Sequence, residues 1–449
     1  MIEGYESPWR RVDPSQNEFA RLDEAQREAW LLRRLNILVA HARAKAEYYK
    51  DLPAEPLTST DQIRGLPILE NPMYRKHTPP NGTQLVAIPN SSGLALASGG
   101  TTGEPRSCYR TAEEQHVIAT RLAWGLDAAG IKPGDVVANL MPPGNLWVPF
   151  ISYLGALEHL EVRVLPIGRA YSAEAALKWM NRYQVNVLLG YPAEIVRVVL
   201  EAPQGSTFPK IRLIATSGTP VYEGPRRLME QAFGGPRFVS AGYASNDTGP
   251  MGYQCEHCNT GTFHLQDDLQ ILEILDVDSH EPIAKGVNGK MIFTQLLLRV
   301  VPVIRYAIGD IGKWVNEDHC PCGRRSPRFE LSGRTDDMLV GEALQLLPET
   351  LDKALHGVAG IGPDWQLQVT SENSLDCVTL RVETLPDIAP HTVDVDLLRC
   401  NLLTCCPDMV SDLEEQRLGK VEAKVYPYGA LPRSPRTGKI TLFLDERRR

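Results

Sequence analysis

The sequence lacks a long, uninterrupted hydrophobic run. Residues 1–16 contain no apolar core of the kind found in signal peptides, so we expect no secretion signal. Residues 136–157 carry no formal charge, but Pro142, Pro143 and Gly144 interrupt this segment. We therefore expect it to form a strand, a turn and a buried helix rather than a helix that crosses a membrane.

The chain also lacks an excess of positive charge. It has 47 Lys and Arg against 55 Asp and Glu, which gives a formal net charge of −8 and a pI near 5.8. This composition argues against nonspecific binding of nucleic acid, which requires a basic face. Nine cysteines without a secretion signal indicate a reducing compartment, with free thiols or a metal site, and we expect a cytoplasmic protein.

Short apolar runs alternate with helical patterns between Asp135 and Pro225. The runs VVANLM, VRVLPI, VNVLLG and IRLIATSG are typical of strands, while SAEAALKWMNRY and AEIVRVVLEAP are typical of helices. This alternation predicts an α/β domain with a largely parallel sheet. A long amphipathic helix is expected earlier in the chain, over residues 14–52.

The character of the sequence changes near Ser332 to Asp337. Residues 269–278 and 289–298, before this point, are strand-like, whereas residues 365–385 after it predict a β-hairpin followed by helices. We therefore expect two parts. A large N-terminal domain of mixed sheets and helices would cover residues 1–333, and a small, mobile α+β C-terminal domain would cover residues 334–449.

A loop rich in Gly, Ser and Thr, Ala97-Ser-Gly-Gly-Thr-Thr-Gly-Glu-Pro-Arg106, is the first motif with recognisable chemistry. Its glycines permit close backbone approach, and backbone N–H groups in such loops bind anions. It is not a Walker A motif, because no Gly-Lys-Ser/Thr ends it, and taken alone it reads equally well as an exposed flexible loop. The candidate phosphate-binding residues are Ser98, Gly99, Gly100, Thr101, Thr102 and Gly103.

Three further motifs follow along the chain. Pro302-Val-Ile-Arg-Tyr-Ala-Ile-Gly-Asp310 ends in an acid that suits binding of ribose hydroxyls, and equally a turn with a capping Asp. Gly333-Arg-Thr-Asp-Asp337 taken alone reads as a polar linker. Leu431-Pro-Arg-Ser-Pro-Arg-Thr-Gly-Lys439 taken alone reads as a solvated surface segment. No one of these motifs is decisive, but their order and spacing are.

Together the four motifs resemble those of the adenylate-forming superfamily, which contains acyl-CoA synthetases, peptide-synthetase adenylation domains and luciferases. Arg-Tyr-x-x-Gly-Asp is intact at 305–310, Gly-Arg-x-Asp-Asp at 333–337, and Pro-Arg…Gly-Lys is matched at 432–439 with a longer spacer. Within that superfamily the chain is most similar to the phenylacetate–CoA ligase branch. Tyr48-Tyr49-Lys50 at the end of the first helix and Cys320-Pro-Cys-Gly323 resemble elements of that branch.

The resemblance implies an ATP-dependent, AMP-forming acid–CoA ligase. Such an enzyme activates a small carboxylic acid, here expected to be aromatic, as an acyl-adenylate and transfers the acyl group to CoA, using Mg²⁺ with ATP. Two alternatives stay open: delivery to the phosphopantetheine thiol of an acyl carrier protein, and a noncatalytic, zinc-stabilised homologue. Trp147, Phe150 and Tyr153 are candidates for the wall of the acid pocket, although a role in the hydrophobic core is favoured. The oligomeric state is open, a homodimer included.

The resemblance also assigns roles to residues. Lys439 would bridge the substrate carboxylate and the α-phosphate, Thr102 would act with the phosphate loop, and Asp310 would bind ribose with Arg334 beside it. Asp247 would hold Mg²⁺. The adenine and the acyl phosphate would be flanked by Ser217, Gly218, Thr219, Tyr243, Ala244, Ser245 and Asn246.

Two departures from the family pattern bear on these roles. Glu104 replaces the lysine of the family's phosphate loop. The family's Tyr-Gly-x-Thr-Glu stands here as Tyr243-Ala-Ser-Asn-Asp247, so the carboxylate is one methylene shorter. A metal ion would then have to lie closer to Asp247 or be reached through water. Asp336 matches the position about which the family's C-terminal domain rotates, and we expect a hinge there.

Two cysteine pairs indicate a metal site. Cys255-Glu-His-Cys258 is a CxxC motif and Cys320-Pro-Cys322 is a CxC motif, and two such pairs make a tetrahedral zinc site stereochemically reasonable. The phenylacetate–CoA ligase branch often uses a histidine here, for which His264 is the nearest match. The fourth ligand is therefore open between Cys258 and His264. We expect the zinc to be structural, and the alternative is four unconnected thiols.

Overall fold

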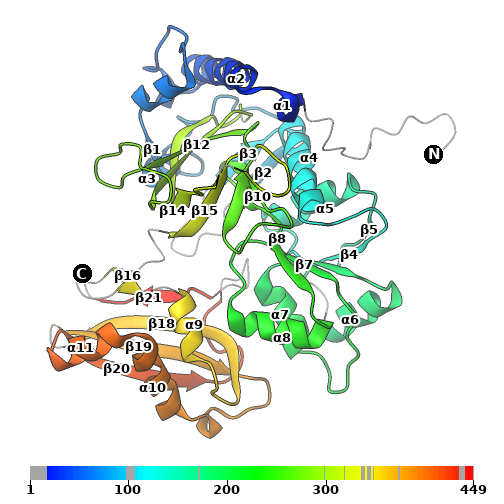
Figure 1. Ribbon diagram of the computed structural model, residues 1–449, viewed down its shortest axis with the longest axis vertical. Helices are drawn as coiled ribbons and strands as arrows, with labels where there is room; N and C mark the ends of the chain where they lie inside the picture. Colours follow the sequence, from blue (N-terminus) through cyan, green and yellow to red (C-terminus); the bar gives the residue numbers. More distant parts are fainter. Residues whose placement is uncertain are drawn as a thin grey trace.

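The computed structural model describes residues 18–97, 107–169, 172–297, 299–317, 319–334, 339–340, 345–346, 348–372, 375–433 and 440–447 (Figure 1). Among them, three sheets of four or more strands organise the chain. The helices and strands after Pro348 gather at one end of the molecule, drawn in yellow to red in Figure 1.

The N-terminal helix predicted over residues 14–52 is confirmed from residue 18, with a break. Helix α1 covers Glu18–Arg21, helix α2 covers Glu24–Lys45, and the 3₁₀ turn η2 covers Glu47–Tyr49. The break is a capping box at Asp23, whose side chain accepts from the backbone N–H of Gln26 while the Gln26 side chain accepts from Asp23. Helix α2 buries its apolar stripe against the main core.

The predicted parallel α/β unit is confirmed. Its five strands lie in the order β5-β4-β6-β7-β8, and every neighbouring pair is parallel. The strands are β4 (Val136–Asn139), β5 (Arg163–Leu165), β6 (Val187–Gly190), β7 (Leu213–Thr216) and β8 (Arg237–Ser240). The helices are α5 (Pro149–Glu158), α6 (Ala173–Arg182), α7 (Pro192–Leu200) and α8 (Glu223–Phe233).

Both faces of this sheet are buried. On β6, Val187 and Leu189 belong to the main core, whereas Leu188 between them belongs to a second core on the opposite face. This alternation is why the strands read as nearly continuous apolar runs. Residues 136–157 form the expected strand, turn and helix, and no described helix is long and apolar enough to cross a membrane.

A larger, mainly antiparallel sheet follows, in the order β12-β13-β14-β15-β11-β10-β9, with the two-residue β1 paired to β14. Its strands are β1 (Leu69–Glu70), β9 (Tyr243–Ser245), β10 (Gly249–Tyr253), β11 (Thr262–Leu265), β12 (Gln270–Leu275), β13 (Gly289–Gln295), β14 (Val303–Trp314) and β15 (Arg328–Arg334). The strands expected near residues 269–278 and 289–298 are therefore confirmed as β12 and β13. A separate hairpin, β2 (Leu94–Ala97) and β3 (Ser107–Arg110), precedes helix α4 (Ala112–Ala128). The connecting helices are η3 (Thr60–Gly65) and α3 (Asn71–His77).

The C-terminal elements form their own sheet and their own core around Trp365. The strands lie in the order β20-β19-β18-β21, and the predicted hairpin over residues 365–385 is confirmed as β18 and β19. The elements are β16 (Leu339–Val340), β17 (Gln345–Leu346), α9 (Pro348–Ala354), β18 (Ile361–Glu372), β19 (Leu375–Thr384), η4 (Pro390–Thr392), α10 (Val395–Cys405), α11 (Pro407–Glu414), β20 (Leu418–Tyr426) and β21 (Phe443–Asp445). Strand β15 of the larger sheet extends to Arg334, the first residue that the sequence assigned to the C-terminal part.

Helix α9 touches the parallel unit at the start of helix α8. The backbone N–H groups of Glu223 and Gly224 donate to Asp352 Oδ2 over 2.9 and 3.3 Å. Tyr222, at the N-cap position of α8, supplies no capping hydrogen bond from its side chain. Asp352 therefore caps this helix from a distant part of the chain.

Candidate active site

The phosphate loop predicted at residues 98–103, with Thr102, lies outside the described residues, but the two strands that flank it are described. Ala97 at the end of β2 pairs with Ser107 at the start of β3, on either side of the predicted loop. The Asn246 side-chain amide donates to the Ala97 carbonyl over 2.6 Å. Arg110 in turn donates to the Asn246 carbonyl over 2.6 Å. These contacts hold the Tyr243–Asp247 segment against the base of the predicted loop.

Asp310 lies within a strand and not in a turn. Strand β14 continues past it to Trp314, so the turn-capping alternative for this residue is wrong. The antiparallel register places Arg334 of β15 directly opposite Asp310, and Arg334 Nη1 donates to Asp310 Oδ1 over 2.9 Å. The Tyr243 hydroxyl donates to the other carboxylate oxygen, Oδ2. Asp310 thus contacts both Tyr243 and Arg334, and all three residues are predicted for one site.

Asp247 is almost fully buried, with 1% of its surface exposed. The Tyr306 hydroxyl donates to Asp247 Oδ2 over 3.1 Å. Next to it, Ser245 Oγ lies 2.9 Å from Thr248 Oγ1, which fixes the turn after β9. A carboxylate this deep can serve as one ligand of a hard cation such as Mg²⁺, whose other ligands are commonly water and phosphate oxygens.

The segment predicted to border adenine, Ser217 to Thr219, directly follows the parallel strand β7. Ser217 Oγ lies 3.3 Å from the hydroxyl of Tyr153, while Gly218 and Thr219 are exposed. Gly218 has φ of +83°, a conformation that favours glycine. Burial raises the pKa of Tyr153 to about 12, so its hydroxyl stays protonated and neutral. Ala244, in β9, is exposed.

The aromatic residues considered for the acid pocket pack into the core. Tyr153 is buried in the main core, and Trp147 and Phe150 are partly buried against it. The Trp147 indole N–H donates to the Tyr191 hydroxyl over 2.7 Å. Because Tyr153 also reaches Ser217, this aromatic group lies next to the segment predicted to border the nucleotide.

Arg305, although part of the Arg-Tyr-x-x-Gly-Asp motif, is a structural residue. It is 5% exposed and makes a two-pronged ion pair with Glu273, each contact being 2.9 Å. Its third guanidinium nitrogen donates to the carbonyls of Leu66 and Arg64. Arg305 therefore links strand β14 to the end of η3 and to Leu66, which follows it. Nothing in the local sequence distinguishes this role from ligand binding.

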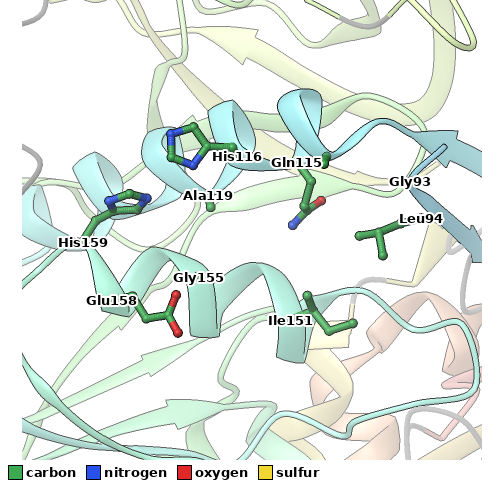
Figure 2. Close-up of a pocket in the computed structure, with 10 residues that line it drawn as sticks. Gly93, Leu94, Gln115, His116, Ala119, Ile151, Gly155, Glu158 and His159 are labelled. Carbon is green, nitrogen blue, oxygen red and sulfur yellow. The ribbon is translucent and has the colours of Figure 1, made fainter. Parts of the chain in front are cut away.

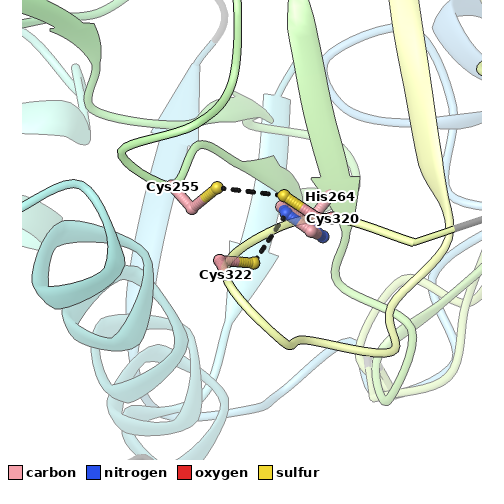
Figure 3. Close-up of side chains that lie close together, drawn as sticks. All are labelled: Cys255, His264, Cys320 and Cys322. Carbon is pink, nitrogen blue, oxygen red and sulfur yellow. Dashed lines mark hydrogen bonds between the residues drawn. The ribbon is translucent and has the colours of Figure 1, made fainter. Parts of the chain in front are cut away.

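The cysteine motifs converge with a histidine (Figure 3). The ligand atoms of Cys255, His264, Cys320 and Cys322 all lie within 4.8 Å of one another. Cys255 Sγ is 3.6 Å from Cys320 Sγ, and Cys322 Sγ is 3.5 Å from His264 Nε2. Cys258 lies beside Cys255, with sulfur atoms 3.6 Å apart, but is not part of this group of four. The geometry thus favours His264 over Cys258 as the fourth ligand.

The surroundings of His264 suit a metal ligand. Its Nδ1 lies 3.2 Å from the Ser326 carbonyl, which can only accept, so Nδ1 carries the proton and Nε2 faces the thiols with its lone pair. The Tyr253 ring stacks on the imidazole. Burial lowers the pKa of His264 to about 4, so the ring is neutral near pH 7. Three thiols and a neutral imidazole fit a tetrahedral zinc ion.

A shallow pocket of about 350 Å³ lies between helices α4 and α5 (Figure 2). His116 of α4 and His159 at the end of α5 face each other there, with ring centroids 5.3 Å apart. The residues that line the pocket are Gly93, Leu94, Ala112, Gln115, His116, Ala119, Ile151, Gly155, Glu158 and His159. None of the described residues predicted for the nucleotide or the metal lines it, so this pocket is separate from both sites.

Besides the predicted phosphate loop, two more predicted residues lie outside the described part of the chain. They are Lys439, expected to bridge carboxylate and phosphate, and Asp336, expected to be the hinge. The role of Arg110, which donates to the Asn246 carbonyl, could not be predicted from the sequence, because an arginine in a short strand carries no local pattern typical of such a role.

Sequence comparison finds relatives that span the chain. It is 26% identical to a phenylacetate–coenzyme A ligase of Thermus thermophilus, over 96% of this chain and 99% of that protein. It is 25% identical to a phenylacetate–coenzyme A ligase of Escherichia coli K12, over 83% of this chain and 85% of that protein.

Structural comparison gives the same fold. A 2-hydroxyisobutyryl-CoA ligase crystallised in the postadenylation state with 2-HIB-AMP matches 98% of this chain and 95% of that chain, with a TM-score of 0.78 at 21% identity. The same ligase in the thioesterification state, with 2-HIB-AMP and CoA, matches 96% and 91% with a TM-score of 0.64 at 23% identity. The mixed α/β fold of adenylate-forming ligases is therefore shown for this chain.

Residues 66–296, just over half of the chain, match the family of AMP-binding enzymes. This range contains the predicted phosphate loop and the strands that flank it, the parallel sheet, and the Tyr243–Asp247 segment. The site geometry and the comparisons agree, and the chain belongs to the family of AMP-binding enzymes.

Proposed function

We propose that this chain is an AMP-forming acid–CoA ligase that activates a small aromatic carboxylic acid. The observation that carries the proposal is the convergence of segments far apart in the sequence. Asn246 contacts the base of the phosphate loop, and Tyr243, three residues earlier, contacts Asp310. One ATP molecule bound along the Tyr243–Asn246 segment would therefore meet the phosphate-binding and the ribose-binding groups together. The relatives named phenylacetate–coenzyme A ligase support an aromatic acid.

In the proposed reaction, the acid carboxylate attacks the α-phosphate of ATP and releases pyrophosphate. The CoA thiol then attacks the acyl carbon and releases AMP. The first step brings an anion towards a polyanion, so positive charge and oriented N–H groups at the phosphates lower its barrier. We assign this role to the phosphate loop with Thr102, and to Lys439.

The ribose end of the site would act by binding and orientation. Asp310, held by Arg334, would accept hydrogen bonds from the ribose hydroxyls, and Ser217 to Thr219 would border the adenine. Asp247 is the described carboxylate suited to hold Mg²⁺, which would supply positive charge beside the phosphates. Because Asp247 is short and buried, we propose that it acts through water.

Zinc would have a structural role in this proposal. Cys255, His264, Cys320 and Cys322 would fill a tetrahedral shell, leaving no open position for catalysis. The bound ion would join the loop after β10 to the segment between β14 and β15.

We also propose that residues 334–449 form a mobile domain that hinges near Asp336. Lys439 and the CoA thiol must act in turn beside the same acyl carbon, which one fixed arrangement does not allow. The two crystallised states of 2-hydroxyisobutyryl-CoA ligase support such a change. The separate C-terminal sheet and core are consistent with independent motion.

The test of the activity is an ATP–pyrophosphate exchange screen over aryl and fatty acids. Exchange stimulated by an aryl acid is expected. If none of the acids in the screen stimulates exchange, the proposal is contradicted. The purified acyl-adenylate is then offered CoA and a carrier protein bearing phosphopantetheine. Transfer to CoA is expected, whereas transfer to the carrier protein alone would favour the adenylation-domain alternative.

Lys439→Ala tests the assignment of the first step. Loss of a cation that bridges two anions in the transition state costs about two to four decades in rate. Pyrophosphate exchange should fall by this amount, while thioester formation from supplied acyl-adenylate should persist. Exchange near the wild-type rate would remove Lys439 from the mechanism.

A further inference from the structure

Two segments of the site share the same pattern of residues. Tyr243 is followed by Asp247, and Tyr306 is followed by Asp310, in each case four positions later. The hydrogen bonds between them are crossed. The Tyr243 hydroxyl donates to Asp310, and the Tyr306 hydroxyl donates to Asp247 over 3.1 Å. Each tyrosine thus holds the aspartate of the other segment.

The crossed contacts connect strands that are not neighbours. Strand β9 is one edge of the large sheet, and β15, β11 and β10 lie between it and β14. In a flat sheet, four strand spacings would separate β9 from β14 by about 19 Å. The sheet must therefore curl until β9 faces β14 across its interior. The two hydrogen bonds join the curled sheet where its edge comes back on itself.

The interior of the curl fixes the orientation of Tyr243. Its ring lies 5.7 Å from Phe263, 6.0 Å from Phe293 and 5.8 Å from Phe329, measured between centroids. These ring contacts therefore set the position of the Tyr243 hydroxyl. Burial, and then the charge of Asp310, raise the pKa of Tyr243 well above its usual value, so the hydroxyl remains a donor.

Asp310 receives a donor on each oxygen. Arg334 donates to Oδ1 over 2.9 Å and Tyr243 donates to Oδ2. Donors on both oxygens prevent rotation of the carboxylate. A carboxylate offers about four acceptor sites, two on each oxygen, so a ribose hydroxyl can donate to either oxygen. Fixing their direction before ATP arrives removes an ordering cost from binding.

We propose that Tyr243 and Tyr306 are a reciprocal pair of positioning residues, which orient Asp310 towards ribose and Asp247 towards the phosphates. The inference rests on the proposed function, because it takes Asp310 as the group that binds ribose. It goes beyond that function by assigning a new role to the two hydroxyls. Tyr243 would select the ribose by orienting Asp310.

The experiment measures nucleotide affinity directly, by calorimetry on the full chain, with ATP, 2′-deoxyATP and 3′-deoxyATP. Asp310→Asn should abolish the preference of the wild type for ATP. Tyr243→Phe should weaken ATP binding about tenfold, the size expected for a hydrogen bond to a charged group, and weaken deoxyATP binding much less. Tyr306→Phe should keep the ribose preference but lower the gain in ATP affinity that Mg²⁺ produces.

Tyr49→Phe is the matched control. Tyr49 is also buried, and its hydroxyl accepts from the Ile304 N–H on strand β14, but its described hydrogen bonds involve neither aspartate. This variant should keep both the ribose preference and the Mg²⁺ effect. A thermal unfolding curve for each variant separates lost binding from lost folding.

The outcomes separate failure of the positioning role from failure of the proposed function. If Asp310→Asn loses the preference for ATP but Tyr243→Phe keeps it, the positioning role is overturned and the proposed function stands. If Tyr243→Phe and Tyr49→Phe change the preference equally, the effect is one of packing and the inference also fails. If the wild type binds no ATP, both the proposed function and the inference fail.

Discussion

The parallel sheet and the curled antiparallel sheet lie side by side in one chain but are stabilised differently. Strands β6 and β7 are buried on both faces, and their residues are apolar except for Gly190 and Thr216. The curled sheet instead buries charged and polar side chains, among them Arg305, Glu273 and Asp310. The first region depends on volume and shape, and the second on the pairing of individual groups. Substitutions should therefore act by different physics in the two regions.

The largest effect is expected from Arg305→Met in the curled sheet. The substitution leaves Glu273 buried without its partner, which costs about 3–5 kcal/mol in the free energy of unfolding. Chemical denaturation measures the loss. Adding Glu273→Leu to this variant removes the unpaired charge and should recover most of the stability.

Leu188→Ala in the parallel sheet is the matched comparison. It should cost about 2–5 kcal/mol by leaving a cavity, and no second deletion should recover this loss. If removing Glu273 fails to rescue Arg305→Met, the buried pair is not what distinguishes the two regions.

The next effect concerns the four proposed zinc ligands, Cys255, His264, Cys320 and Cys322, which lie on or beside the curled sheet. Cys320→Ser removes one of them and should weaken zinc binding by more than the roughly 10–100-fold that loss of an outer hydrogen-bond partner costs. Metal analysis of protein purified without added zinc measures the stoichiometry, and the expected value for the wild type is one ion per chain.

Cys258→Ser is the control for the metal site, because Cys258 lies beside Cys255 but outside the group of four. It should keep its zinc. Loss of zinc from this variant, with retention in His264→Ala, would reverse the assignment of the fourth ligand.

The smallest loss of stability is expected from removing Asp352, a polar group distant in sequence that contacts helix α8 of the parallel region. Asp352→Ala removes the acceptor that caps helix α8 from the C-terminal part and should cost about 0.5–2 kcal/mol. Hydrogen exchange of the first turn of α8 should quicken in this variant. Asp352→Asn retains an acceptor and should change the exchange less. Unchanged exchange in the alanine variant would show that the contact does not support the helix.

The sequence predicted elements more reliably than contacts. Helix α2, the parallel strands and the β18–β19 hairpin follow from apolar periodicity, and the four motifs led to the family. The same motifs misplaced Asp310 in a turn as one alternative, since a glycine before an acid is typical of turns. In the structure, Gly309 has φ of +94° and the register with β15 shifts after Ile311. The glycine is accommodated as an irregularity within strand β14, which continues to Trp314.

Four matters were decided by the tertiary structure alone. Arg305 pairs with the buried Glu273, and His264 lies beside three cysteines. Asp352 caps a helix that is distant in sequence. The tyrosine of each of two motifs donates to the aspartate of the other motif.

The physical reason for this difference is the separation along the chain of the residues that determine each feature. Periodicity and capping are set by residues a few positions apart, so the sequence by itself determined the helices, the parallel sheet and the family. The partner of a buried polar group depends on how strongly a sheet curls and on which strands meet across it. That curvature is a property of the whole sheet, and here it brought β9 to β14 and completed the ribose-binding end of the proposed site.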